Sequence, residues 1–321
     1  MTVTQTVVRE FEADLLVREA ERAADDVVAL TLARPDGAAL PDWTPGAHID
    51  LILGDGLTRQ YSLCGRTADT GTWRVAVLHA PDGRGGSARV HKLTAGDTVR
   101  VRGPRNHFPV AAAPRYLFLA GGIGITPLLP MIHEVDAADA DWTLHYGGRT
   151  RRSMAFRGEL ARYGDRVHLV PQDECGLLDL DAVLGRPRPG TLVYACGPEG
   201  LLAAVEQRCA GWPAGSLHLE RFAARKTDPP AAENSFEVVL QQSGKALRVP
   251  PDRSIFETVR AAGVSVLGSC LEGICGTCET EVVDGEVDHR DSVLDDDERA
   301  ANDVMMICVS RCRGPRLTLA L

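Results

Sequence analysis

Three cysteines lie within nine residues of one another near the C-terminal end of the chain. The segment CLEGICGTC places them at Cys270, Cys275 and Cys278, and Cys308 follows farther along. In a chain that shows no sign of export, such cysteines are reduced, which favours a metal or catalytic site over disulfides. A metal held by four thiolates would also constrain the fold of the loop that carries them.

The spacing of these cysteines indicates the kind of metal site. C-x4-C-x2-C followed by a distant cysteine is the arrangement with which plant-type ferredoxins hold a [2Fe-2S] cluster. We expect Gly268, Gly273 and Gly276 to take positive φ angles that aim backbone N–H groups at the negative cluster. Zinc is the alternative, although its sites usually use two C-x2-C hooks and the chain has one. Cys312 is an alternative fourth ligand, and Cys308 is preferred because it ends an apolar strand.

Composition narrows the class of protein. A chain of 321 residues with 44% hydrophobic and 25% charged residues predicts two or three globular domains. The chain has no apolar run of about 20 residues and its N-terminal segment lacks the features of a secretion signal, so we expect a cytoplasmic protein that does not bind membranes. The net charge of −9 argues against nucleic-acid binding.

The strand and helix patterns predict three domains and a linker. Short β-rich runs broken by Gly, Pro and Asp predict an antiparallel β-barrel over residues 1–110. Apolar strands such as RYLFLA alternate with helical segments over 111–224, which predicts an α/β domain with a parallel sheet. The proline-bearing residues 225–235 predict a linker. Residues 236–321 carry the cysteines and hold 9 Lys and Arg against 15 Asp and Glu, so this block is acidic.

Two segments of the first block have the chemistry to hold a flavin. In RQYSL, Arg59 offers a planar fork to phosphate oxygens and Tyr61 offers an aromatic face to a flat ring. By itself this strand also fits an exposed arginine and a core tyrosine. In DGRGGS, residues 82–87, consecutive glycines before a serine bring backbone amides close to a phosphate. An ordinary turn is the alternative there.

Two segments of the second block predict a nicotinamide dinucleotide site. LAGGIGITP, residues 119–127, runs from a strand through a glycine turn into a helix, the order that suits a pyrophosphate. It does not have the G-x-G-x-x-G spacing, so alone it is weak evidence. YACGP, residues 194–198, ends another strand, where ligands of parallel sheets bind. A buried structural thiol is the alternative for Cys196.

With these motifs in this order, the chain resembles the ferredoxin-NADP-reductase-like flavin reductases. Within them it is most similar to the phthalate dioxygenase reductase family, which joins an FMN domain, a nicotinamide domain and a C-terminal plant-type ferredoxin. The resemblance covers essentially the full chain. It implies a multidomain protein with an antiparallel β-barrel flavin domain, an α/β parallel-sheet nicotinamide domain and an α+β ferredoxin domain of β-grasp fold.

The resemblance also implies roles for the motif residues. Arg59 would pair with the flavin phosphate, Tyr61 would pack beside the isoalloxazine ring, and Ser62 would hydrogen-bond near flavin N5. The family's phosphate loop, which implies FMN over FAD, falls on Gly85, Gly86 and Ser87. Its nicotinamide site falls on Gly121, Gly122, Gly124, Thr126, Pro127, Cys196, Gly197 and Pro198.

Three further positions complete the expected site. Arg149 is expected to contact the ribose or phosphate of the dinucleotide, with a solvated arginine as the alternative. Arg151 and Arg152 would suit a 2′-phosphate, but the resemblance favours NADH over NADPH. Phe222 would cover the flavin face that the nicotinamide enters, with packing at a domain junction as the alternative. Ser62, Cys196 and Phe222 are therefore the catalytic candidates.

Electron counting then predicts the reaction. NADH delivers two electrons as a hydride, the cluster accepts one at a time, and a flavin does both. We expect hydride transfer from NADH to FMN and single-electron transfer through the cluster to a separate terminal oxygenase. The chain has no Rieske or haem-thiolate motif, so a Rieske-type dioxygenase or O-demethylase and a cytochrome P450 are both possible partners. The acidic ferredoxin domain suggests a partner with a basic patch, and a monomer is expected.

Two other functions stay open from the sequence. One is a flavin or small-acceptor reductase in which the ferredoxin domain is regulatory. The other is an assembly protein whose cysteines bind zinc.

Overall fold

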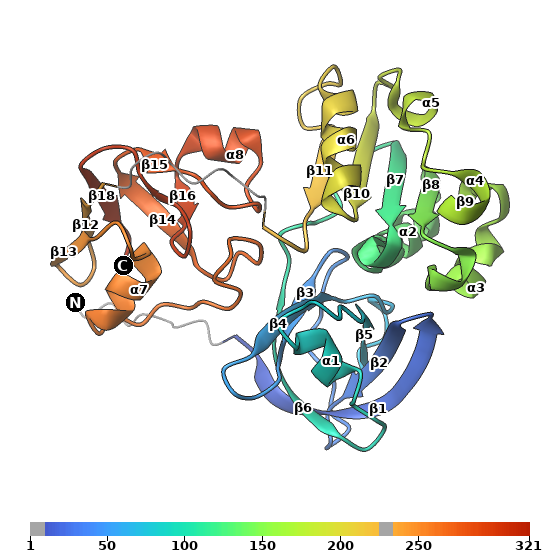
Figure 1. Cartoon of the computed structure of the whole chain (residues 1–321), viewed down its shortest axis with the longest axis horizontal. Coiled ribbons are helices and arrows are strands. Elements are labelled where there is room, and N and C mark those ends of the chain that lie inside the picture. The colour runs from blue at the N-terminus through green and yellow to red at the C-terminus, as the bar shows by residue number, and fades with distance from the viewer. Residues whose placement is uncertain (1–9, 225–233) are drawn as a thin grey trace. The chain divides into compact units, whose positions relative to one another are not determined.

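A computed structural model describes residues 10–224 and 234–321 of the chain. The chain forms two compact units, Met1–Glu220 and Arg221–Leu321 (Figure 1). Most of the predicted linker, residues 225–233, lies outside the described residues. The finer boundary at residue 110 stays a prediction.

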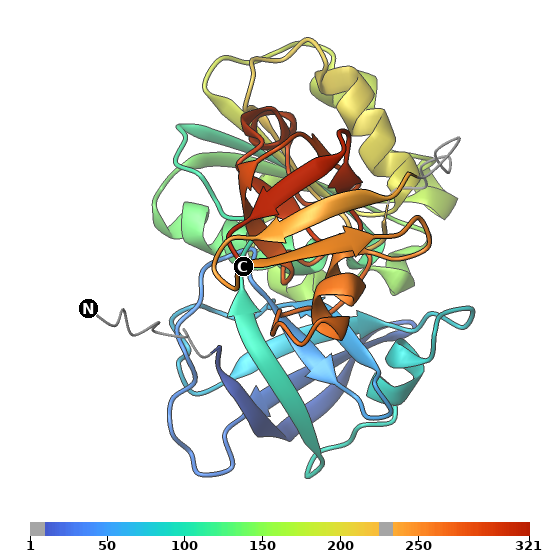
Figure 2. The ribbon, with the colours of Figure 1, turned by 90° about the vertical axis from the view of Figure 1, so that its left-hand side faces the viewer.

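The first unit begins with a six-stranded antiparallel sheet in the order β4-β3-β6-β1-β2-β5. An antiparallel bridge between Leu63 and Val75 joins the two ends of this order and closes the sheet, which confirms the predicted barrel (Figure 2). Alternate residues such as Leu15 and Val17 point inward, as the period of a strand requires. The elements are β1 (Glu12–Ala24), β2 (Val27–Ala33), β3 (His48–Ile52), β4 (Thr58–Ser62), β5 (Trp73–Leu78), α1 (Gly86–Val90) and β6 (Thr98–Arg105).

A five-stranded parallel sheet in the order β11-β10-β7-β8-β9 follows within the same unit (Figure 1). Phe118 and Tyr194 face one hydrophobic cluster and Leu117 and Val193 face another, so the sheet is buried on both faces, as predicted for an α/β domain. The elements are β7 (Arg115–Gly121), η1 (Gly122–Gly124), α2 (Ile125–Ala137), β8 (Asp141–Gly148), η2 (Arg151–Ser153), α3 (Arg157–Leu160), η3 (Ala161–Arg166), β9 (Val167–Pro171), α4 (Gln172–Cys175), α5 (Leu180–Leu184), β10 (Thr191–Cys196), α6 (Glu199–Cys209) and β11 (Leu217–Glu220).

The barrel and the parallel sheet are joined by a partly buried polar network. Arg74 of β5 donates to the backbone oxygen of Cys64 at 2.7 Å and to Glu159 of α3 at 2.9 Å. Its guanidinium also lies 4.8 Å from the centre of the Phe156 ring. His133 of α2 lies 3.2 Å from the second Glu159 oxygen. The network therefore links β5 of the barrel to helices of the parallel-sheet domain.

The ion pairs of Glu159 should make the stability of the first unit depend on pH in the acid range. Burial alone would raise the pKa of Glu159, but its bonds to His133 and Arg74 lower it from 4.5 to about 2. A lowered acid pKa stabilises the fold above pH 4.5, and this stability is lost as pH falls toward 2. We expect Glu159→Gln to lower the free energy of unfolding by on the order of 2 kcal/mol at pH 7. Over this acid window, the free energy of unfolding of the variant should depend less on pH than that of the wild type.

Tryptophan fluorescence measures this effect in the first unit alone, because all four tryptophans lie in it: Trp43, Trp73, Trp142 and Trp212. Asp141→Asn, which removes an exposed ion pair with Arg115, is the matched control and should change stability little. Equal acid dependence in wild type and Glu159→Gln would contradict the prediction.

The second unit is a mixed sheet packed with short helices. Its five main strands follow the order β13-β12-β18-β14-β16, with β12 parallel to β18, which is consistent with the predicted α+β class. Ser254 and Glu257 form a capping box at the start of α7. The elements are β12 (Phe236–Leu240), β13 (Lys245–Val249), α7 (Ile255–Ala261), β14 (Glu279–Asp284), β15 (Val287–Asp288), α8 (Asp296–Ala301), β16 (Val304–Met306), β17 (Arg311–Cys312) and β18 (Arg316–Leu319).

Within the described ranges, no helix has the length and hydropathy needed to cross a bilayer.

Candidate functional site

The four predicted cluster ligands come together as two pairs of thiols. The Cys270 thiol interacts with the Cys275 thiol, and the Cys278 thiol interacts with the Cys308 thiol. The interaction with Cys270 lowers the pKa of Cys275, and the interaction with Cys278 lowers the pKa of Cys308. In a [2Fe-2S] cluster bound by four cysteines, two thiolates serve each iron, so two close pairs are the arrangement that this group requires.

Backbone amides around the pairs supply the predicted N–H donors. Glu272 N–H donates to Cys270 Sγ at 3.3 Å, and Gly273 N–H donates to the Cys308 thiol. Gly273 has φ 68° and Gly276 has φ 67°, as expected. Gly268 was expected to do the same, and this prediction is wrong. A Cβ on Gly268 would lie 2.4 Å from the Phe256 ring, so close packing is what requires glycine there.

The alternatives at this site can be compared with the same geometry. Across the described ranges 10–224 and 234–321, no three His, Cys, Asp or Glu side chains are arranged to hold a single metal ion. Two thiol pairs match the two irons of a [2Fe-2S] cluster, each of which takes two thiolates. Cys312 belongs to neither pair, because its thiol donates to the backbone oxygen of Arg316 at 3.3 Å.

In the first unit, the structure brings the two proposed flavin segments together. A Cβ on Gly86 would lie 2.5 Å from Arg59 Cγ, so the Arg59 side chain crosses the start of α1 directly against the backbone. Gly85 precedes the helix with φ 83°. Ser87 Oγ accepts the Ala80 N–H at 3.0 Å and donates to the Ala80 carbonyl oxygen at 3.5 Å, a long bond that a phosphate oxygen could replace. A guanidinium, free amides and a hydroxyl at one place are a donor set that fits a phosphate.

The neighbouring residues of β4 face different surroundings. Tyr61 is partly buried and packs against the barrel core, and this burial raises the pKa of its hydroxyl to about 12. Ser62 is buried and donates a hydrogen bond to Glu220 at the end of β11. Glu220 Oε2 in turn lies 3.9 Å from Cys196 Sγ. The barrel strand and the parallel sheet therefore meet at three functional groups.

Sequence reasoning singled out Ser62 and Cys196 but missed Glu220. Burial raises the pKa of Glu220 to about 8, against the hydrogen bonds from Cys196 and Ser62, which lower it. Burial and the charge of Glu220 likewise raise the pKa of the Cys196 thiol. The only sequence signal for Glu220 was its place at the end of a strand in HLERF, where parallel pairing sets it opposite Cys196.

The two glycine motifs of the parallel sheet pack against each other through their backbones. A Cβ on Gly124 would lie 2.2 Å from the Cys196 carbonyl oxygen, and one on Gly121 would lie 2.6 Å from Pro198 Cδ. A Cβ on Gly197 would lie 2.9 Å from Gly121 Cα. These contacts leave the amides of both loops at one edge of the sheet, which is where a dinucleotide would bind.

Other residues of this loop have separate roles. Gly122 has φ 54° and a Cβ on it would meet open space, so its backbone conformation requires glycine. Thr126 is buried, and its hydroxyl donates to the Ile123 carbonyl at 3.0 Å, which closes the turn before α2. Pro127 occupies the first turn of α2, where a missing N–H costs nothing.

The remaining predicted residues lie at the surface. Arg149 is exposed just after β8. Arg151 forms a 2.6 Å ion pair with Glu174, and Arg152 lies 3.1 Å from Asp25. Phe222 belongs to the second unit and is 43% exposed, and its role over the flavin stays a prediction.

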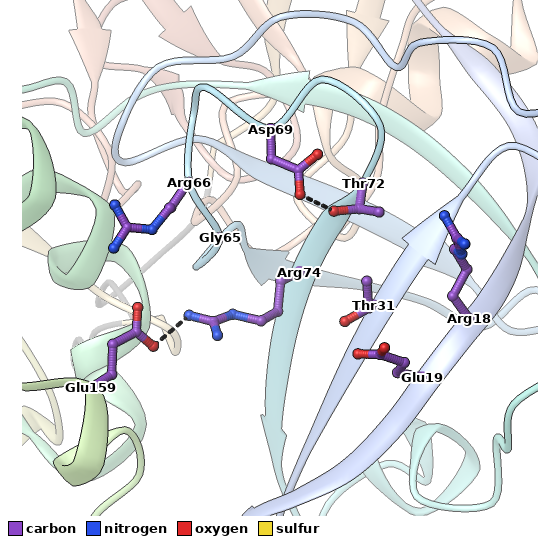
Figure 3. A pocket seen from close by; sticks show the side chains of 9 residues that line it. All are labelled: Arg18, Glu19, Thr31, Gly65, Arg66, Asp69, Thr72, Arg74 and Glu159. Atoms are coloured by element: carbon purple, nitrogen blue, oxygen red, sulfur yellow. Dashed lines mark hydrogen bonds and ion pairs between the residues drawn. The ribbon is translucent and has the colours of Figure 1, made fainter.

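A polar cavity of about 470 Å³ lies elsewhere in the first unit, beside the Arg74–Glu159 pair (Figure 3). None of the motif residues above lines it, so it is distinct from the site proposed for the flavin and nicotinamide. Its lining consists of Arg18, Glu19, Thr31, Gly65, Arg66, Asp69, Thr72, Arg74 and Glu159.

Comparison with known proteins agrees with this division of the chain. Residues 14–109 match the oxidoreductase FAD-binding domain family, and residues 238–313 match the 2Fe-2S iron-sulfur cluster binding domain family. The phenoxybenzoate dioxygenase subunit beta of Ectopseudomonas oleovorans is 44% identical over 93% of this chain and 94% of that protein. The fold and these matches define an iron–sulfur flavoprotein oxidoreductase.

Two solved structures extend the comparison. An intact type IV self-sufficient cytochrome P450 monooxygenase is 47% identical with a TM-score of 0.92; the match covers 97% of this chain and 41% of that one, so this chain spans about two fifths of its length. Phthalate dioxygenase reductase, described as a modular structure for electron transfer from pyridine nucleotides to [2Fe-2S], is 35% identical with a TM-score of 0.70 over 97% and 98% of the two chains. The chain belongs to the phthalate dioxygenase reductase family.

The raised pKa of Glu220 predicts a loss of stability toward alkaline pH. Below pH 4.5 the group is neutral in both states, and between 4.5 and about 8 the unfolded state ionises while the folded state keeps its proton. Stability of the first unit should therefore fall across this window, by on the order of 2–4 kcal/mol. We expect Glu220→Gln to remove this decline when unfolding is followed by tryptophan fluorescence at pH 5 to about 9.

The matched control is Glu134→Gln, which changes an exposed carboxylate on α2 and should keep the wild-type pH dependence. An unchanged alkaline decline in Glu220→Gln would show that another group causes it.

Proposed function

We propose that this protein is the NADH-oxidising reductase of an oxygenase system, with FMN and one [2Fe-2S] cluster as its resident groups. The observation that carries the proposal is the meeting of Ser62 on the barrel with Cys196 and Glu220 at the carboxyl ends of two parallel strands. Bound flavin supplies the chemistry that takes two electrons from a nicotinamide and releases them singly. The two thiol pairs supply the site from which single electrons leave.

The side chains position the reactants and no acid–base step is required of them. Arg59, Gly86 and Ser87 form the phosphate site, and Tyr61 flanks the ring. Ser62 is held by Glu220, which orients its hydroxyl toward one side of the junction. The backbone contact of Gly124 with Cys196 fixes the position of the nicotinamide loop against the end of β10. Close, fixed stacking is the main requirement of hydride transfer.

The choice of FMN over FAD rests on the compact phosphate site. Arg59 lies directly across the first residues of α1, so its guanidinium lies beside the backbone that begins this helix. A terminal monophosphate matches such a site better than a pyrophosphate bridge that must continue past it.

The choice of NADH over NADPH rests on the partners of the arginines. Arg151 and Arg152 already pair with Glu174 and Asp25, so both would have to give up an ion pair to bind a 2′-phosphate. Arg149 then serves the ribose or pyrophosphate of NADH.

The electron acceptor is proposed to be a separate terminal oxygenase. Relatives of this chain include a dioxygenase subunit and the reductase portion of a self-sufficient P450, which supports both a Rieske-type oxygenase and a cytochrome P450 as partner classes. Docking is proposed near the acidic ferredoxin domain, which suits a basic partner surface. We propose a cytoplasmic monomer with the domain divisions 1–110, 111–224, 225–235 and 236–321.

Analysis of the purified chain tests the proposal. We expect absorption from flavin and a [2Fe-2S] cluster, iron and acid-labile sulfide in equal amounts, and FMN in an acid extract separated by chromatography. Anaerobic titration should bleach the flavin with NADH at far lower concentration than with NADPH. A colourless zinc protein would overturn the function, FAD in the extract would overturn the flavin assignment, and equal response to NADPH would overturn the nucleotide assignment.

A further inference from the structure

A buried carboxylate outside the cysteine motif lies beside the proposed cluster. Asp291 is 3% exposed and sits between β15 and α8. Its Oδ2 accepts the backbone N–H groups of Val293 at 3.1 Å and Leu294 at 2.8 Å. Ser310 Oγ donates to its Oδ1 at 3.4 Å. Because Ser310 follows Cys308 by two residues, Asp291 is joined to the segment that carries the fourth thiol.

The same loop also contacts the other ligand segment. Ser292 N–H donates to the Gly273 carbonyl at 2.8 Å, and a Cβ on Gly273 would lie 3.0 Å from Asp291 Cα. The N–H of Gly273 donates to the Cys308 thiol. One glycine residue therefore separates the backbone of Asp291 from a proposed cluster sulfur.

An arginine accompanies this carboxylate at close range. Arg299 of α8 donates to the Asp291 carbonyl oxygen at 2.8 Å, and the same nitrogen lies 3.9 Å from Asp291 Oδ2. The Arg299 side chain is 23% exposed, whereas that of Asp291 is fully buried. His289 Nδ1 lies 3.8 Å from Asp291 Oδ1, and burial lowers the pKa of His289, so this ring is neutral near pH 7. Asp291 and Arg299 are thus a partly buried charge pair beside the cluster loop.

We propose that Asp291 and Arg299 set the reduction potential of the [2Fe-2S] cluster, with Asp291 lowering it and Arg299 raising it. The inference rests on the proposed function, because it assumes that the two thiol pairs hold the cluster. Reduction adds one negative charge to the cluster, which a nearby buried carboxylate disfavours and a nearby guanidinium favours. Neither side chain is a cluster ligand, so the pair acts on the reduction potential through its charges.

Variants of Asp291 and Arg299 should shift the midpoint potential of the cluster in opposite directions. Structural damage would not produce shifts of opposite sign. In Asp291→Asn the charge of Arg299 loses its counterion, so the midpoint potential of the cluster should rise. In Arg299→Gln the carboxylate loses its counterion, so the potential should fall. We expect each to change the one-electron reduction equilibrium about tenfold, equivalent to about 59 mV.

The measurement is a redox titration of the full-length, cluster-containing protein, monitored by the electron paramagnetic resonance of the reduced cluster. Glu286→Gln is the matched control, because Glu286 is 67% exposed in its pair with Arg313 and its charge is screened by water. This variant should keep the wild-type potential.

Each result bears on the inference. Opposite shifts with an unchanged control support it, and no shift in either variant or shifts of the same sign overturn it. If Asp291→Asn assembles no cluster, Arg299→Gln alone tests the inference. A lower midpoint potential in Arg299→Gln would then support it, and an unchanged or higher potential would overturn it. A wild-type protein without a cluster signal would instead count against the proposed function.

Discussion

The variant Cys275→Ser should lose NADH-driven cytochrome c reduction by at least about 100-fold while NADH still bleaches the flavin. Cys275 is one member of a thiol pair in the second unit, whereas the proposed flavin and nicotinamide residues other than Phe222 lie in the first. Removing the thiolate should therefore break the path of single electrons without touching hydride transfer. Stopped-flow absorbance separates the two steps, and iron analysis shows whether the cluster is lost.

Cys312→Ser is the matched control for this experiment. Cys312 belongs to neither thiol pair and donates to a backbone oxygen, so its replacement should leave the iron content and cytochrome c reduction at wild-type values. Retained cytochrome c reduction in Cys275→Ser would favour the small-acceptor reductase with a regulatory ferredoxin domain. Loss of iron in Cys312→Ser would contradict the assignment of Cys308.

The variant Gly124→Ala should have the largest effect in the first unit. The φ of Gly124 is −61°, which any residue adopts, so the cost is steric alone. Its new Cβ would lie 2.2 Å from the Cys196 carbonyl oxygen, a backbone atom of the neighbouring strand end. We expect a loss of on the order of 3 kcal/mol of stability or a displaced loop, and NADH-driven flavin bleaching slowed about 100-fold.

Gly200→Ala is the matched control, because a Cβ at this position in α6 meets no atom within 4 Å. Replacement of a helical glycine in open space should leave bleaching unchanged and add up to about 1 kcal/mol of stability. Tryptophan fluorescence and stopped-flow absorbance measure both variants. Wild-type bleaching in Gly124→Ala would show that the two glycine motifs do not need their close contact.

The features that sequence reasoning found are those whose signal is local. The cysteine loop could be recognised because three of its ligands lie in one short segment and their spacing reflects the geometry of the cluster. The barrel and the parallel sheet could be predicted because the period of the apolar residues follows from burial on one face or on both. Even here local reasoning failed at Gly268, where packing against Phe256 and not backbone conformation requires glycine.

Glu220 and Asp291 became visible only in the tertiary structure. Each is a carboxylate of ordinary appearance in the sequence, with no motif around it. Their character comes from burial and from neighbours far along the chain: Ser62 and Cys196 for Glu220, and Gly273 and Ser310 for Asp291. The amino-acid sequence determined which groups the protein can hold, because ligand spacing and strand period are local. Only the tertiary structure decided which charged side chains lie near those groups. Electrostatic energies depend on distances between segments, and the order of residues does not reveal these distances.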